Sequence, residues 1–267
     1  MPAEALALAL AAAFLHAGWN VLLRGSADVA ARTVAVLCWS VVLFAPAAAA
    51  TWRADAGVVP YVAASAAAEG LYFLLLVAAY RRRELSVVYP VARGSAPALV
   101  LAGTAVVLGR AVSSWEVAGV LLVAAGVVLV RGLRRGAEGI GVGLSIGVAI
   151  ATYTLIDKEG LRHAAPIPYL ELVLAPLAVL ALLARPSALR TQLSWSTVGA
   201  AVGSFGAYVL FLFALRLTAA PGVAAVRETS VVIGAALAAV FLKEHVSWPR
   251  FAGAAAVAGG VAILAVA

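Results

Sequence analysis

The chain has 267 residues, of which 65% are hydrophobic and only 12% are charged, and its mean hydropathy is +1.07. Soluble domains carry about 25% charged residues, and the apolar residues here form long runs instead of amphipathic stripes. These features exclude a soluble globular protein and predict an all-α integral membrane fold. The net charge of +7 is scattered over many short loops, which is typical of juxtamembrane positions and excludes a nucleic-acid-binding surface.

The apolar runs predict about ten membrane spans, at about 20 residues for each. Turn-like or charged separators such as RGSAD, YRRRE and RGLRRGAEG stand between them. The first run has no basic flank and is interpreted as a retained span, not a cleaved signal. We place the spans at residues 3–23, 29–50, 58–80, 85–108, 115–130, 139–156, 166–184, 196–215, 219–242 and 249–266.

The two halves of the chain repeat each other at a shift of 134 residues. Each half holds five predicted spans, and because this number is odd the second half enters the membrane from the opposite side. The sequence therefore predicts two inverted five-helix repeats, residues 1–133 and 134–267, as in many secondary transporters. The ungapped shift superimposes identical residues: Arg93 on Arg227, Gly119 on Gly253, and Gly126 on Gly260.

Basic residues are unevenly divided between the two sides of the predicted membrane. Twelve arginines and lysines follow odd-numbered spans, whereas five follow even-numbered spans. By the positive-inside rule this places both termini outside the cytoplasm. The protein is expected to lie in the cell (plasma or inner) membrane as a multi-pass protein.

Four charged residues lie near the middle of predicted spans: Glu69, Arg93, Arg227 and Glu228. A charge at this depth is costly and usually faces the bundle interior. Neighbouring helical residues point about 100° apart, so the Glu228 side chain is expected to face another span. There it either pairs with Arg93 or binds a coupling proton. Two interpretations stay open: substrate binding or gating by the arginines, or a structural arginine–glutamate pair that locks helices together.

One helical face of the first span carries His16, Trp19 and Asn20, at i, i+3, i+4 spacing. These side chains are interpreted either as the lining of a substrate cavity or as hydrogen-bonding contacts between helices. Tyr153 is a further cavity candidate, with packing as its alternative role. Asp157 and Lys158 are expected at the membrane interface.

Motifs for ATP hydrolysis and for common metal sites are missing from the sequence, and no cofactor or metal is predicted. The stretch GLSIG at 143–147 matches the G-x-S-x-G nucleophile pattern around Ser145. That pattern requires a strand–turn–helix context, which the apolar helical run does not provide. An intramembrane serine hydrolase that uses Ser145 is kept as an alternative function.

The segments that begin YRRRELSVVYPVARG and VRETSVVIGAAL resemble the carboxyl-terminal half of the EamA repeat of the drug/metabolite transporter superfamily. Leu242, Lys243, Glu244 and Ser247 match the turn of that repeat, whereas the first half has Arg110 in place of the acid. HAGWN and YTLIDKEG also fit the family. The resemblance implies ten helices in two inverted repeats and the export or exchange of small metabolites.

We therefore expect a secondary transporter that works by alternating access, with its cavity between spans 1–4 and 6–9. Two arginines balanced by Glu69 and Glu228 favour a zwitterion or a small organic anion as substrate. The expected partners are this small molecule, the lipid bilayer and a coupling proton, without nucleic acid; monomer and homodimer both stay open. A non-transporting membrane assembly partner is the remaining alternative.

Overall fold

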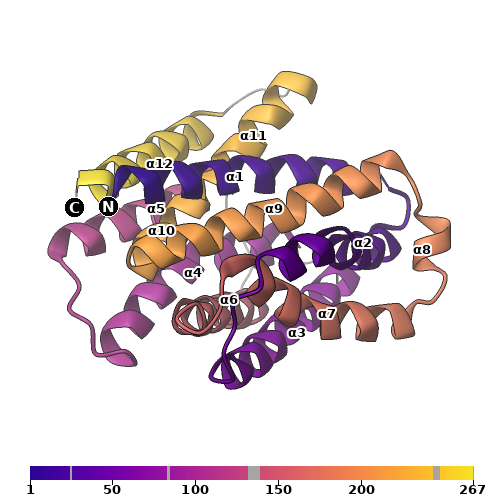
Figure 1. Ribbon diagram of the computed structural model, residues 1–267. Helices are drawn as coiled ribbons and strands as arrows, with labels where there is room; N and C mark the ends of the chain where they lie inside the picture. Colours follow the sequence, from indigo (N-terminus) through magenta and orange to yellow (C-terminus); the bar gives the residue numbers. More distant parts are fainter. Residues whose placement is uncertain (25, 83–84, 132–138, 243–246, 267) are drawn as a thin grey trace.

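The computed structural model describes residues 1–24, 26–82, 85–131, 139–242 and 247–266. Apart from one isolated bridge between Ala54 and Ala164, these residues form helices and the turns between them (Figure 1). The prediction of an all-α membrane fold is confirmed. The helices are α1 (Ala3–Arg24), α2 (Val29–Ala50), α3 (Val58–Arg82), α4 (Leu85–Val106), α5 (Ser114–Arg131), α6 (Ile140–Gly160), α7 (Pro166–Ala184), α8 (Ala188–Thr191), α9 (Trp195–Leu217), α10 (Ala220–Arg227), α11 (Thr229–Leu242) and α12 (Trp248–Val266).

Eight helical segments in the described part are long and apolar enough to cross a membrane, with α10 and α11 contributing one segment, Ala220–Leu237. The chain is therefore a multi-pass membrane protein. The other two predicted spans are helical, as α4 and α5. Neither is among these eight segments, α5 being the shorter apolar helix, so the number of ten spans remains a prediction.

Two local features differ from the expected helices. The span predicted at 219–242 is divided at Glu228 into α10 and α11, and the loop after α7 contains the short helix α8. The described residues leave out most of the turn motif at 242–247, most of the linker RGLRRGAEG and the last two residues of the linker YRRRE.

Both chain ends lie at the same end of the bundle (Figure 1). The Met1 amino nitrogen lies 3.2 Å from the carbonyl oxygen of Leu264 in the last helix. The chain therefore crosses the bundle an even number of times, and the prediction that both termini share one side is confirmed. We call this end, which also carries the α2–α3, α4–α5, α6–α7 and α9–α10 connections, the terminal end.

Glycines bring α5 and α12 into close contact. A Cβ atom on Gly126 would lie 2.7 Å from the Gly253 oxygen, and one on Gly260 would lie 2.7 Å from the Gly119 oxygen. Small residues allow such backbone approach between membrane helices. Under the 134-residue shift, Gly126 corresponds to Gly260 and Gly253 to Gly119, so the shift converts the first of these contacts into the second. Reciprocal contacts of this kind are typical of a two-fold relation. They support the repeat boundaries, which remain a proposal.

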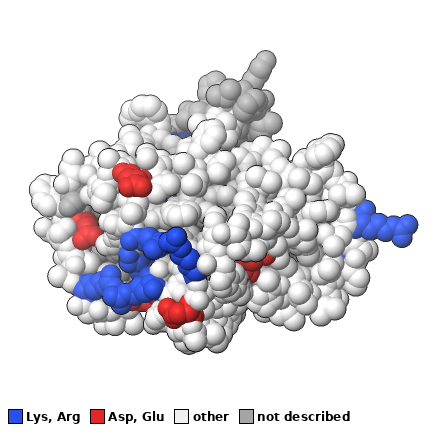
Figure 2. Space-filling model, viewed as in Figure 1, with Lys and Arg blue, Asp and Glu red and all other residues white. Residues whose placement is uncertain are grey.

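The outer surface matches a lipid environment. Large apolar side chains such as Leu74, Val106 and Leu183 are exposed, and charged side chains cover little of the face in Figure 2. Four exposed tryptophans mark helix ends, as expected for membrane interfaces: Trp52, Trp115, Trp195 and Trp248.

Candidate functional site

Helix α4 and the α10–α11 junction bring opposite charges together in the protein interior. Arg93 Nε lies 3.0 Å from Glu228 Oε2, and Arg93 Nη2 donates a hydrogen bond to Ser230 Oγ at 3.2 Å. All three residues are buried. The prediction that Glu228 addresses Arg93 on another span is confirmed, and this ion pair ties α4 to the junction.

Arg227, the residue before Glu228, has different neighbours. Its guanidinium carbon lies 4.4 Å from the centre of the Phe211 ring and 5.1 Å from that of Tyr208. These are cation–π distances. Within the described residues no carboxylate forms an ion pair with Arg227, although only 7% of the residue is exposed. Ring faces therefore stabilise this buried charge.

At Glu228, between α10 and α11, the backbone leaves the regular α-helix. The amides of Glu228 and Val231 donate to carbonyls three residues back, and the Thr229 hydroxyl donates to the Val226 carbonyl at 2.8 Å. Such i→i−3 bonds tighten a turn, and hydroxyl bonds to the backbone compete with the helix ladder. The span predicted at 219–242 is therefore one membrane segment, Ala220–Leu237 in its described part, that is interrupted at Glu228 beside the charges.

Asp157 on α6 is a buried hydrogen-bond centre. Its carboxylate accepts from Ser65 Oγ at 2.5 Å, from the Tyr169 hydroxyl at 2.9 Å and from the Tyr208 hydroxyl at 2.7 Å. These donors belong to α3, α7 and α9. Asp157 lies near the end of α6, but it is enclosed by neighbouring helices and only 1% exposed, which the sequence did not predict. The i, i+4 spacing from Tyr153, which places both on one helical face, was the available signal.

Glu69 on α3 lies beside this centre. The residue is 4% exposed, and its Oε1 atom has no hydrogen-bond partner within the described part of the chain. It lies within electrostatic range of Asp157, Tyr208 and Arg227. Two acids and one arginine thus share the region between α3, α6 and α9.

The stripe predicted on α1 is divided between two environments. His16 lies within electrostatic range of Arg93 and Arg227 and meets the Trp19 ring edge-on at 5.4 Å. Trp19 also packs against Gly203 of α9, and the Asn20 amide donates to the His16 carbonyl at 2.7 Å. His16 therefore joins the central charges, whereas Trp19 packs between helices and Asn20 bonds to its own helix.

Tyr153 of α6 is buried within a group of tyrosines. Its ring centre lies 6.2 Å from that of Tyr72 and 6.3 Å from that of Tyr208. Tyr208 links this aromatic group to Asp157 and Arg227. We call Glu69, Arg93, Tyr153, Asp157, Tyr208, Arg227 and Glu228 the central cluster.

Ser145 does not belong to the central cluster. It is exposed, lies in the second turn of α6 and donates its hydroxyl hydrogen to the Gly141 carbonyl of the same helix at 2.9 Å. The turn that follows a strand in the nucleophile motif is replaced here by regular helix.

Comparisons with known proteins point to one family. Residues 137–266 match the EamA-like transporter family. A solved crystal structure with 16% sequence identity superimposes with a TM-score of 0.79, covering 98% of this chain and 96% of that one, and establishes the similarity of fold. None of the curated proteins compared with the chain matches it.

Proposed function

Because the chain belongs to the EamA-type drug/metabolite transporters, we propose that this membrane transporter is a secondary active carrier. It exports or exchanges a small polar metabolite, a zwitterion or an organic anion, by alternating access. It lies in the cell membrane, and the loop charges support an orientation with both termini outside the cytoplasm.

The observation that carries the proposal is the environment of Arg227. A buried guanidinium without a carboxylate partner in the described chain is suited to bind an anion, because its planar fork offers two parallel N–H donors to a carboxylate or phosphate. Its position beside the break between α10 and α11 supports this role, since broken helices form the binding sites of many transporters.

The other predicted residues receive different roles in this proposal. His16, Glu69 and Tyr153 line the site, and Glu69 with Asp157 binds the cationic group of a zwitterion or a coupling proton. Arg93 and Glu228 hold α4 against the broken helix. Trp19 and Asn20 position α1.

Contacts at the terminal end support alternating access. The connections α2–α3 and α6–α7 pair through the Ala54–Ala164 bridge, with Asp55 N donating to His163 O at 3.0 Å and Ala165 N donating to Arg53 O at 2.7 Å. The His163 ring also lies 3.0 Å from the Asp55 carboxylate. These contacts join the two proposed repeats, and in the proposed cycle their separation would open the terminal end.

Metabolite profiles of cells with and without the gene test the function directly. Loss of the gene is expected to raise the internal level of a zwitterion or organic anion, and purified protein in liposomes should then exchange that compound. The Arg227→Lys variant should restore neither phenotype. Unchanged profiles together with no exchange by the purified protein would contradict the proposal.

A further inference from the structure

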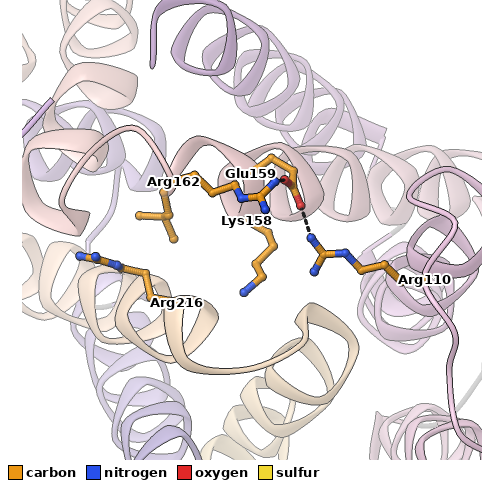
Figure 3. Close-up of a pocket in the computed structure, with 6 residues that line it drawn as sticks. Arg110, Lys158, Glu159, Arg162 and Arg216 are labelled. Carbon is orange, nitrogen blue, oxygen red and sulfur yellow. Dashed lines mark hydrogen bonds and ion pairs between the residues drawn. The ribbon is translucent and has the colours of Figure 1, made fainter. Parts of the chain in front are cut away.

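A second group of charges lies at the terminal end, away from the central cluster. Figure 2 shows basic side chains gathered there, on the left of the view. They surround a pocket of about 250 Å³ that is formed by the α4–α5 connection, the end of α6 and the end of α9 (Figure 3). The charged residues of this vestibule are Arg110, Lys158, Glu159, Arg162 and Arg216.

Glu159 forms ion pairs with two of the four cations of the vestibule. Arg110 Nη2 lies 2.7 Å from Glu159 Oε1, and Arg162 Nη1 lies 2.9 Å from Glu159 Oε2 (Figure 3). Glu159 therefore holds two guanidinium groups from different connections side by side. Each guanidinium has five N–H donors, so both keep donors for a further partner.

The other two cations, Lys158 and Arg216, form no ion pair with an acid among the described residues. Lys158 Nζ donates to the carbonyls of Leu215 and Thr218 at the end of α9, and Arg216 is exposed and forms no ion pair there. Four positive charges against one negative charge leave the vestibule with a charge of +3. Basic residues that only reach for the membrane interface would spread apart, whereas these converge on one pocket.

Helix α9 connects the vestibule to the central cluster. Phe211, which holds Arg227, precedes Arg216 by five residues, or about 8 Å along the helix. The fully buried Leu212 and Leu215 lie between them. On α6, Asp157 binds Tyr208 while the next residue, Lys158, reaches the vestibule. The vestibule thus borders the central cluster at the end of α6, and buried leucines of α9 separate Arg216 from the ring that holds Arg227.

We propose that the vestibule binds a small, doubly charged oxyanion from the water at the terminal end and is the outermost binding site on the path of the transported anion. The second part rests on the proposed transport function, whereas anion binding does not. Paired guanidinium groups suit oxyanions because each can form two parallel hydrogen bonds. The pocket is smaller than the sites of drug-sized ligands, which favours an ion or a small ester.

Calorimetric titration of the purified protein in an uncharged detergent with inorganic phosphate tests the binding. We expect saturable binding that Arg216→Gln and Arg162→Gln each weaken by about tenfold, as for the loss of one charge-assisted contact. Arg190→Gln, an exposed arginine of α8 outside the vestibule, is the matched control and should leave binding unchanged. Both test residues are exposed, so folding should be retained.

Binding that persists in an Arg227→Gln background would locate the phosphate in the vestibule, not at the central cluster. Absence of saturable binding, or binding unchanged in the Arg162→Gln/Arg216→Gln double variant, would overturn the proposal. Failure of the transport function alone would leave phosphate binding intact, so the two failures are distinguishable.

A lipid headgroup presents the same phosphate chemistry, and nanodiscs separate the two sources. Phosphate affinity is compared in phosphatidylcholine discs with and without phosphatidylglycerol. Equal affinities support a soluble anion as the occupant. Displacement of phosphate by phosphatidylglycerol would assign the vestibule to lipid and overturn the proposal.

Discussion

Arg93 and Glu228 form a 3.0 Å ion pair between α4 and the α10–α11 junction, although 135 residues separate them in the chain. Arg227, the partner of Arg93 under the repeat shift, instead lies on the Phe211 ring. Equivalent arginines thus have different surroundings. We expect Arg93 to matter first for stability and Arg227 first for transport.

Replacing Arg93 by leucine should destabilise the protein. The change leaves the Glu228 carboxylate buried without its ion-pair partner, and breaking a buried pair from one side costs about 3–5 kcal/mol. The unfolding temperature of the protein in detergent, monitored by size-exclusion chromatography after heating, measures the loss of stability. The Arg93→Leu/Glu228→Leu double variant should recover most of the stability, because it leaves no unpaired charge. A double variant as unstable as the single one would show that the two residues do not act as a pair.

Replacing Arg227 by lysine should reduce transport with little change in stability. Lysine keeps the positive charge but offers a point charge instead of a planar fork, so uptake into liposomes should fall by about tenfold or more. Arg190→Lys, outside the central cluster, is the control. Wild-type uptake by Arg227→Lys would contradict an oxyanion contact at this residue.

Glu69 is the acid in the central cluster best placed to carry a coupling proton. Glu228 forms an ion pair with Arg93 and Asp157 accepts three hydroxyl hydrogen bonds, whereas Glu69 forms no ion pair within the described residues. Glu69→Gln should abolish uptake driven by a pH gradient and keep substrate exchange across the membrane. If the variant still responds to the gradient as the wild type does, Glu69 carries no coupling proton.

Hydropathy was sufficient to locate the helices, because a membrane span needs about 20 apolar residues and its ends are marked by charges and turns. The expected limits 29–50 and 166–184 coincide with α2 and α7. The same signal could not reveal the break at Glu228. That break depends on hydroxyl and carbonyl bonds within a short segment, which a hydropathy average does not register.

The central cluster was only partly predictable from the sequence. Mid-span depth correctly indicated that Glu69, Arg93, Arg227 and Glu228 are buried. Asp157 was missed because it lies near a helix end, and its burial depends on Ser65, Tyr169 and Tyr208 from three other helices. Tertiary packing decides such a position.

Cross-linking of the two paired connections at the terminal end should stop transport. Ala54 and Ala164 form a bridge in which the flanking residues, not these two, exchange the backbone hydrogen bonds. In that arrangement the Cα atoms lie about 4.5 Å apart, within the range of about 4.4–6.8 Å that a disulfide requires. The pair Ala54→Cys/Ala164→Cys should therefore form a disulfide under mild oxidation.

The buried Cys38, the chain's one native cysteine, is first replaced by alanine so that only the new pair can react. If the terminal end must open in each cycle, oxidation should abolish uptake into liposomes and reduction should restore it, because the disulfide keeps the Ala54 and Ala164 connections together. Each single cysteine variant controls for the substitution and for the oxidant. Full uptake by protein that is demonstrably cross-linked would show that these connections stay together throughout transport, and the opening would then have to occur elsewhere in the bundle.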